Sequence, residues 1–301
     1  MLGADIPQVP AASFQRLYDA DRSDLPEPVY VTLRDGFRLA YRSYPGAAER
    51  AVVLLHGAAG HSAHMHTLSR AIADARLATV YAIDIRGHGL SGGPAGHAVT
   101  GFDVLRDDVL EVIETVRVGQ PGAFVVLGGF SAGGGLAVRV AESAGQLVDG
   151  YLLLAPYLGA AAPSTRPSIG GWARPNLVRM ASLVTLNSLG IRRFNNRTVV
   201  AFSQPETPRD GLEALRWSFC TAIAFGPRSW KRGLAAIRPR HPLLIVVGDR
   251  DDCFYPSSYA PMVAAHAPHG SVRHVADCGH WDVLVLPAAL EAMTTWLAGL
   301  P

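Results

Sequence analysis

The stretch that decides the fold is residues 124–135, which read FVVLGGFSAGGG. It passes from an apolar run through the pentapeptide GFSAG, residues 129–133, into a helical pattern. This is the G-x-S-x-G arrangement, in which a strand-to-helix turn presents a strained, exposed serine at the carboxyl end of a sheet. The flanking residues must be small because a side chain at Gly129 or Gly133 would collide with neighbouring backbone. Ser131 is therefore the candidate nucleophile.

A second pentapeptide, GLSGG at residues 89–93, also fits the pattern. The two differ in context, because Ser131 directly follows an apolar run and opens a helical pattern, whereas Ser91 lies in a loop rich in glycine and proline. The chemistry requires the strand-turn-helix setting. We therefore expect Ser91 to have no catalytic role.

Outward from Ser131, short apolar runs alternate with helical patterns along the chain, as in a parallel sheet covered by helices on both faces. The expected strands are residues 51–55, 78–83, 123–127, 150–154, 243–247 and 271–275. The expected helices are residues 66–74, 102–116, 132–144, 257–266 and 287–297. Residues 29–44 alternate apolar and polar positions around Asp35-Gly36, a pair that suits a type I′ hairpin. The sequence thus predicts an α/β fold whose mostly parallel sheet begins with an antiparallel hairpin.

One long segment interrupts this alternation between the expected strands at 150–154 and 243–247. It contains three of the five tryptophans and two helix-like segments, residues 177–189 and 211–224. We interpret it as a helical cap inserted before the penultimate strand. The expected organisation is an N-terminal extension (1–28), the first part of the core (29–156), the cap (157–240) and the second part of the core (241–301).

Composition and charge narrow the class of protein. The chain has 301 residues, of which 49% are hydrophobic and 17% charged, as in a compact globular protein without long disordered tails. Residues 160–238 hold twelve basic and three acidic residues, although the net charge of the whole chain is only +2. Such an excess is typical of a face that meets anions, and solvated arginines explain it equally well. We expect weak contact of the cap with anionic lipid or a membrane surface, and no nucleic-acid partner.

Targeting signals and disulfides are not expected. No apolar run reaches the roughly 18 residues that a membrane-spanning helix needs. Residues 1–13 lack a basic start followed by an apolar block, so a cytoplasmic location is expected. The three cysteines, Cys220, Cys253 and Cys278, lack metal-ligand spacing and are expected to be free buried thiols.

A serine hydroxyl needs a base to take its proton, and that base needs an acid to orient it. His280 follows the last expected strand and precedes the final helix, which places it in a loop at the carboxyl edge of the sheet. The preceding strand ends in Gly248-Asp249-Arg250-Asp251-Asp252. Asp251 is preferred as the acid because the turn needs a residue or two before a side chain can point back, and Asp249 and Asp252 remain alternatives.

Acyl transfer also needs hydrogen-bond donors where negative charge develops on the carbonyl oxygen. The backbone N–H of Ala132, next to the nucleophile, is one candidate. The loop HGAAG at residues 56–60 follows the expected strand at 51–55 and offers the N–H of Ala58 as the second. Candidate substrate contacts are four aromatic residues, Phe130, Trp172, Trp217 and Trp281.

Four histidines gather in residues 56–66, at positions 56, 61, 64 and 66. Their spacing gives no clear pair on one face of a helix, and no nearby acidic residue completes a ligand shell. We therefore expect no metal and no cofactor.

The chain order Ser131, Asp251, His280 is that of the α/β-hydrolases. The sequence resembles that superfamily and, within it, the monoacylglycerol lipase, lysophospholipase and carboxylesterase-like group. The resemblance rests on residues 56–58 with His61-Ser62, on Asp84 with the run RGHGLS at 86–91, and on the motifs at 129–133, 248–251 and 279–280. In that group the loop at 84–91 is structural. The resemblance spans roughly residues 29–300, although the HGA loop departs from the HGGG form of other lipases.

We expect a serine hydrolase that cleaves carboxylic esters, resembling a monoacylglycerol, a lysophospholipid or a small acyl ester, through an acyl-serine intermediate. The run FSAGGG at 130–135 is also similar to cofactor-free haloperoxidases, which are perhydrolases with the same triad, and amide, thioester or carbon–carbon bond hydrolysis stays open. A non-catalytic ligand-binding sensor is the alternative from another class. Dehalogenases and epoxide hydrolases of this fold use an aspartate where Ser131 stands, so Ser131 argues against both.

Overall fold

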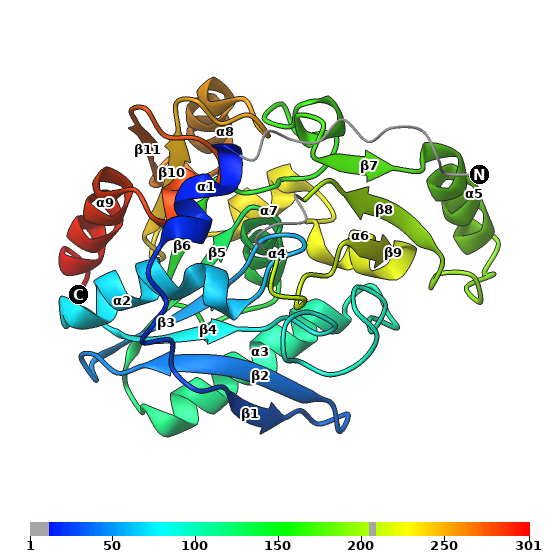
Figure 1. The fold of residues 1–301 in the computed structure, drawn as a ribbon. Coiled ribbons are helices and arrows are strands. Elements are labelled where there is room, and N and C mark those ends of the chain that lie inside the picture. Colours follow the sequence, from blue (N-terminus) through cyan, green and yellow to red (C-terminus); the bar gives the residue numbers. More distant parts are fainter. Residues whose placement is uncertain (1–11, 205–208) are drawn as a thin grey trace.

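A computed structural model describes residues 12–204 and 209–301 of the chain (Figure 1). Its centre is an eight-stranded sheet in the order β1-β2-β4-β3-β5-β6-β10-β11. The strands are β1 (Val29–Thr32), β2 (Arg38–Tyr44), β3 (Arg50–Leu55), β4 (Thr79–Ile83), β5 (Phe124–Phe130), β6 (Gly150–Leu154), β10 (Leu243–Gly248) and β11 (Ser271–Val275). Strands from β4 to β11 run parallel, and β1 and β2 are antiparallel additions at one edge. This confirms the predicted α/β-hydrolase sheet.

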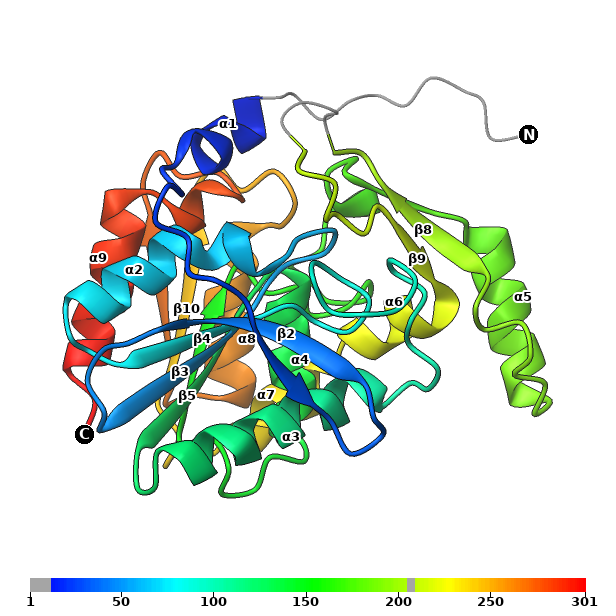
Figure 2. The same cartoon turned by 60° about the horizontal axis from the view of Figure 1, so that its bottom comes forward.

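Helices cover both faces of the sheet (Figure 2). On one face, α2 (His66–Asp74) packs beside α9 (Pro287–Ala298). On the other lie α3 (Val104–Gly119), α4 (Ala132–Ala141) and α8 (Tyr259–His266). Every residue of β6 and β10 is buried, which explains why these strands are apolar on both sides. The core of the protein is therefore the sheet with its two helical layers.

The first hairpin forms as predicted, but its turn is not type I′. A type I′ turn needs positive φ at both central residues, and of the pair Asp35-Gly36 only Gly36 has one, at +82°. Leu33 instead receives the N–H of Gly36 at 2.8 Å and donates its own N–H to Phe37 O at 2.9 Å. The Asp35 carboxylate accepts the Phe37 N–H, which holds this aspartate at negative φ and lengthens the loop.

The segment between β6 and β10 folds as a mixed cap rather than from helices alone. It contains α5 (Leu177–Ser188), α6 (Phe219–Phe225) and α7 (Trp230–Ala236) together with a small antiparallel sheet of β7 (Ala173–Pro175), β8 (Thr198–Phe202) and β9 (Arg216–Ser218). The helix predicted over 211–224 begins only at residue 219, because Ser218 caps it by accepting the Thr221 N–H. We propose residues 157–240 as the extent of the cap.

Several polar contacts join the cap to the core, and two of them lie close to the candidate site. The indole N–H of Trp217 donates to His88 Nε2 at 2.9 Å. The guanidinium of Arg139, on α4, donates to the carbonyl oxygens of Ile223 and Gly226 at the end of α6. The cap is therefore attached close to the helix that follows Ser131.

The N-terminal segment, predicted only as an extension, contains a helix that packs on the core. Helix α1 (Ala12–Asp19) buries Phe14 and Leu17 and contacts the short helix η4 (Asp282–Leu284). Residues 1–11 lie outside the part that the structure describes. Three further short helices are η1 (Ser62–Met65), η2 (Pro167–Ile169) and η3 (Pro256–Ser258).

The three cysteines are free and buried, as predicted. Burial raises the pKa of the Cys220 thiol to about 11, so this thiol stays protonated at neutral pH. Among the described residues, no helix is both long and apolar enough to cross a membrane.

Candidate active site

The predicted nucleophile sits at a sharp turn between β5 and α4. Ser131 has φ 51° and ψ −115°, a backbone conformation that costs a non-glycine residue on the order of 1–3 kcal/mol. The turn is held by the Ser131 N–H, which donates to Leu154 O, and by the Ser131 carbonyl, which accepts from Tyr157 N, both at 2.8 Å. Neighbouring strand ends thus hold the serine in a strained position.

The glycines around Ser131 are required by close backbone contacts. A Cβ on Gly129 would lie 2.4 Å from Gly133 O, and one on Gly133 would lie 2.4 Å from both Leu55 O and His56 O. Real Cβ atoms do not come that close to oxygen, so helix α4 can approach the end of β3 only with glycine at these positions. The same approach brings the loop after β3 next to the nucleophile.

The carboxyl ends of β10 and β11 bring the predicted acid and base together. His280 Nδ1 lies 2.8 Å from Asp251 Oδ2, and both side chains are buried. The other carboxylate oxygen of Asp251 accepts the N–H groups of Cys253 and Phe254, each at 2.8 Å. These bonds stabilise the ionised carboxylate and fix its direction. Asp249 is used elsewhere, because it accepts the Cys278 N–H.

His280 packs against the residue that precedes Ser131. The ring centroid of His280 lies 4.8 Å from that of Phe130, the residue before the nucleophile. Within residues 12–204 and 209–301, Ser131 Oγ makes no hydrogen bond with His280. Such bonds are often long in ligand-free enzymes and tighten when substrate binds. A missing Ser131–His280 hydrogen bond is therefore compatible with the predicted roles of the two residues.

The loop after β3 lies against the nucleophile. A Cβ on Gly57 would be 2.8 Å from the Phe130 ring and 3.3 Å from Ser131 Cβ. In the described part of the chain the N–H groups of Ala58 and Ala132 have no hydrogen-bond acceptor. Ala132 N–H is also the first donor of α4, so the positive end of the helix dipole adds to it. Two backbone donors are thus available beside Ser131.

His56 supports this loop as a neutral side chain. Its Nδ1–H donates to Gly57 O at 2.7 Å, while its Nε2 accepts the Ile85 N–H at 3.1 Å. Complete burial lowers the pKa of His56 to about 3, and burial together with the nearby His56 lowers the pKa of His88 to about 3. Both imidazoles are therefore structural acceptors near neutral pH.

Ser91 has a structural role, in agreement with the prediction. Its hydroxyl accepts the Ala40 N–H at 2.8 Å and donates to Asp84 O. The Asp84 carboxylate accepts the N–H groups of Ser62 and Leu90, which ties the segment after β3 to the loop after β4. The second pentapeptide thus belongs to a structural loop.

Two of the four predicted aromatic contacts, Phe130 and Trp281, pack on His280, and a third, Trp172, packs on Trp281. The Trp281 ring lies 5.2 Å from Phe130 and 5.3 Å from Trp172 between centroids. Among the described residues, the buried Trp172 Nε1 has no hydrogen-bond partner. The fourth, Trp217, stacks on Phe225 at 4.3 Å and uses its N–H on His88. Trp217 is thus engaged in attaching the cap.

The N-terminal helix contributes residues that the sequence did not identify. Phe14 packs on Trp281 with centroids 4.5 Å apart, and Arg16 pairs with Asp282 at 2.8 Å. The Asp282 carboxylate also accepts the Gly279 N–H, next to His280. The spacing of Phe14, Leu17 and Tyr18, one face of a helix, was the signal available in the sequence.

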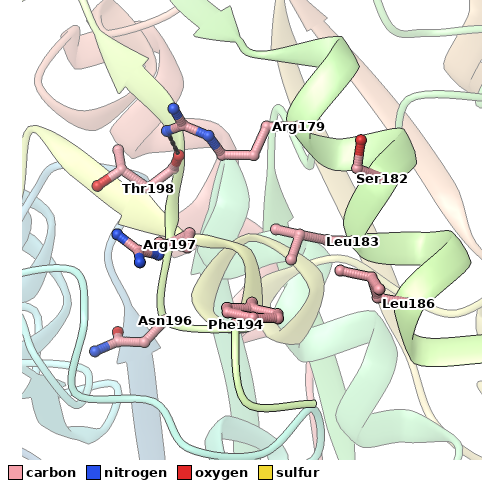
Figure 3. A pocket seen from close by; sticks show the side chains of 8 residues that line it. All are labelled: Arg179, Ser182, Leu183, Leu186, Phe194, Asn196, Arg197 and Thr198. Carbon is pink, nitrogen blue, oxygen red and sulfur yellow. Dashed lines mark hydrogen bonds between the residues drawn. The ribbon is translucent and has the colours of Figure 1, made fainter. Parts of the chain in front are cut away.

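The cavity shown in Figure 3 lies elsewhere, within the cap. Its volume is about 460 Å³, and its lining comes from α5 and the segment that leads into β8. Arg179 closes one side by donating to Thr198 O at 2.6 Å. None of the candidate catalytic residues lines it. Ser131 and His280 are only 5% and 2% exposed, so the candidate site is nearly closed by its surroundings.

Two clusters of side chains could offer metal ligands. One is Asp251, Cys253 and His280, which overlaps the candidate triad. The other is His61, His64 and Glu213. The expectation that no acidic residue lies near these histidines is therefore wrong, because the cap brings Glu213 to them from a distant part of the sequence.

Comparisons with known proteins agree with the geometry. Residues 46–280 match a protein family described as serine aminopeptidase, S33. Human monoglyceride lipase is 33% identical over 135 residues, which span 44% of this chain and 43% of the human protein, less than half of that relative's length.

Among solved structures, a soluble variant of monoglyceride lipase from Saccharomyces cerevisiae superposes with a TM-score of 0.69 at 16% identity, covering 90% of this chain and 94% of the yeast chain. A thermostable carboxyl esterase from Bacillus coagulans gives 0.67 at 16% identity, covering 91% and 98%. At these identities the structural matches support the fold.

Proposed function

The chain belongs to the serine aminopeptidase S33 family of α/β-hydrolases, and from that premise we propose that it is a serine hydrolase of carboxylic esters. The observation that carries the proposal is the alignment at one sheet edge of a strained serine, a buried histidine–aspartate pair and two backbone donors. The family description does not decide which bond is cleaved, since amide and ester hydrolysis use the same groups.

In the proposed mechanism Ser131 Oγ attacks the acyl carbon of the ester while His280 Nε2 takes the hydroxyl proton. Asp251 holds the His280 Nδ1–H and stabilises the imidazolium that forms. The N–H groups of Ala58 and Ala132 receive the oxyanion of the tetrahedral intermediate. His280 then protonates the leaving alcohol, which leaves the acyl group on Ser131. In the second half, His280 takes a proton from a water that attacks the acyl carbon and then returns the proton to Ser131 Oγ as the acid is released.

The surroundings favour an apolar acyl group. Phe130, Trp172 and Trp281 form an aromatic wall beside His280. An alkyl chain against these rings gains about 0.8 kcal/mol per buried methylene. The Trp172 indole N–H offers one hydrogen bond to a polar group of the substrate. Since the monoglyceride lipases match in sequence and in fold, we propose a monoacylglycerol-like ester as the substrate class.

Access to the site requires movement of the cap, because Ser131 is buried. The outer helix α5 provides a surface for lipid, with Leu177, Val178 and Leu189 each at least two-thirds exposed. Arg192 and Arg193 follow it directly along the chain and are exposed. We propose that this apolar and basic surface rests on anionic lipid while the substrate enters.

Activity against p-nitrophenyl esters tests the proposal. Ser131→Ala should lower kcat/KM by about 10³-fold or more, because no other hydroxyl can form the acyl intermediate. The matched control is Ser91→Ala, which removes the serine of the other pentapeptide; it should reduce stability by about 1–3 kcal/mol and leave the folded enzyme active. Full activity of Ser131→Ala would refute the assignment.

Substrate class is tested by comparing monoacylglycerols, lysophospholipids, thioesters, amides and peracid formation with the same preparation. The proposal expects the highest kcat/KM on monoacylglycerols. If no substrate reacts and a fluorophosphonate does not label the protein, the chain is a ligand-binding member of its family.

A further inference from the structure

The second cluster of possible metal ligands lies where the segment after β3 meets the cap. His61 directly precedes η1 and His64 lies within it, and their ring centroids are 4.2 Å apart. One ring nitrogen from each and one carboxylate oxygen of Glu213 all lie within 4.8 Å of one another. Asp210 Oδ2 lies 3.1 Å from His61 Nε2. Two imidazoles from the core thus face two carboxylates from the cap.

Backbone contacts orient the cap carboxylate. Glu213 Oε1 accepts the Asp210 N–H at 3.2 Å, and its Oε2 accepts the Gly211 N–H at 3.0 Å. Because a carboxylate offers about four acceptor positions, these bonds leave lone pairs on both oxygens. Outer contacts of this kind hold the ligands of metal sites in position.

His64 supplies the second, independent observation. Its side chain is 95% buried, being 5% exposed, and its ring forms no hydrogen bond within residues 12–204 and 209–301. A buried polar group without a partner costs roughly 1–3 kcal/mol. A bound ligand that accepts the imidazole lone pair would remove that cost, and the neighbours of His64 that could share such a ligand are His61 and Glu213.

We propose that His61, His64 and Glu213 bind a divalent transition-metal ion, with Asp210 completing the site. Imidazole and carboxylate donors in this number suit zinc. Tetrahedral zinc with bonds of about 2.0–2.2 Å places two ligand atoms roughly 3.3–3.6 Å apart, so ligand atoms that lie within 4.8 Å of one another would move together by up to about 1.5 Å on binding. Two carboxylates balance the charge of the ion. Arg22 interacts electrostatically with both carboxylates, so its positive charge disfavours binding of a cation.

The ion would join the cap to the loop that carries Ala58, three residues before His61. This is a bridge between the two parts of the molecule, and it holds whether or not the proposed ester hydrolysis is correct. Its binding is therefore measured directly rather than through activity.

Titration of the full chain with Zn²⁺, followed by calorimetry, and with Co²⁺, followed by visible absorption, tests the proposal. Calorimetry should give one ion per chain. The d–d absorption bands of Co²⁺ should be those of a metal with few ligands, and the unfolding temperature should be higher with the metal than without it. His64→Gln and Glu213→Gln should each weaken binding at least about tenfold. The matched control, His274→Gln, removes an exposed histidine from β11 and should bind as the wild type does.

Unfolding temperatures without metal check that the variants fold; His64→Gln removes no hydrogen bond, and glutamine at 213 keeps an acceptor oxygen. Equal affinity in wild type, His64→Gln and Glu213→Gln would overturn the proposal, as would the absence of binding at millimolar Zn²⁺. Binding that is lost only in His280→Gln would place the ion at the triad instead and would also overturn it.

Discussion

The carboxyl edge of the central sheet and the outer face of the cap are built in opposite ways. At the sheet edge the backbone is so close that Gly133 has no space for one more carbon atom. On the outer face of the cap lies α5 (Figure 2). Val178 near its start is four-fifths exposed, and a Cβ added to Gly190, two residues after its end, would have nothing within 4 Å. The candidate catalytic groups thus rest on positions that tolerate almost no change, and the surface that we propose for lipid contact rests on positions that tolerate much.

This difference separates two questions. In the proposed mechanism the bond-breaking step depends on groups held by strand ends and buried hydrogen bonds, so it should be the same for every substrate that reaches Ser131. We propose that selection and delivery of the substrate depend on the cap. Variants in the two regions should therefore differ in kind as well as in size of effect.

The largest effect is expected at the acid. Asp251→Asn should keep the fold but lower kcat by about 10⁴-fold, because an amide stabilises the wrong tautomer of His280 and no longer balances the imidazolium. Asp249→Asn is the matched control, since the one side-chain hydrogen bond of Asp249 among described residues is with the Cys278 N–H, and it should lose less than about tenfold. Steady-state kinetics on p-nitrophenyl butyrate compares them, and equal losses would contradict the assignment of Asp251.

The next effect compares two glycines. Gly133→Ala should destabilise the protein by about 3 kcal/mol or more, because its Cβ meets two backbone oxygens that cannot move independently. Gly190→Ala, in the cap, should cost only about 1 kcal/mol, the strain of an alanine at φ +79°. Urea unfolding measures both, and a smaller cost at Gly133 would break the proposed contrast between the regions.

Acid should weaken the core through its buried histidines. His56 and His88 have folded-state pKa values of about 3, below the ordinary 6.5, so between these values the unfolded chain binds more protons than the folded one. Stability is therefore lost as the pH falls below about 6.5, by up to about 1.4 kcal/mol per pH unit for each histidine. Unfolding free energies at pH 7, 6 and 5 should show a shallower slope in His88→Gln, whereas an unchanged slope would contradict the burial argument.

The smallest effect is expected on the outer face of the cap. Val178→Ser and Leu189→Ser each remove exposed apolar surface, so partitioning onto anionic vesicles should weaken by roughly 1 kcal/mol per substitution. Activity on a short water-soluble ester should stay unchanged, because neither residue contacts the site. Vesicle co-sedimentation checks the first statement, and a matching loss on the soluble ester would show that α5 acts on catalysis rather than on lipid contact.

The same contrast explains what the sequence could predict. Six parallel strands and the helices between them follow from apolar runs and glycine positions, because a doubly covered sheet imposes those patterns on each strand. The positions of Ser131 and His280 could be predicted because each residue comes shortly after the carboxyl end of a predicted strand. The aspartate followed less directly, since three candidates shared one turn, and what distinguishes Asp251 is its contact with His280 Nδ1 and its bonds to the Cys253 and Phe254 N–H groups.

The cap was predicted less well. Strands β7 and β9 have three residues each, too few to show alternation. One predicted helix is shorter than expected because Ser218 is its N-cap residue. The cluster of His61, His64 and Glu213 could not be predicted either, because about 150 residues separate its histidines from its carboxylate. Only the fold of the cap over the core brings them together.

The most direct measurement of the central claim is the site of covalent labelling by a fluorophosphonate, read by mass spectrometry of the peptide that contains residue 131. We predict one adduct, on Ser131 Oγ, with labelling slowed by several orders of magnitude in His280→Gln. Labelling at another residue, or an unchanged rate in His280→Gln, would contradict the account.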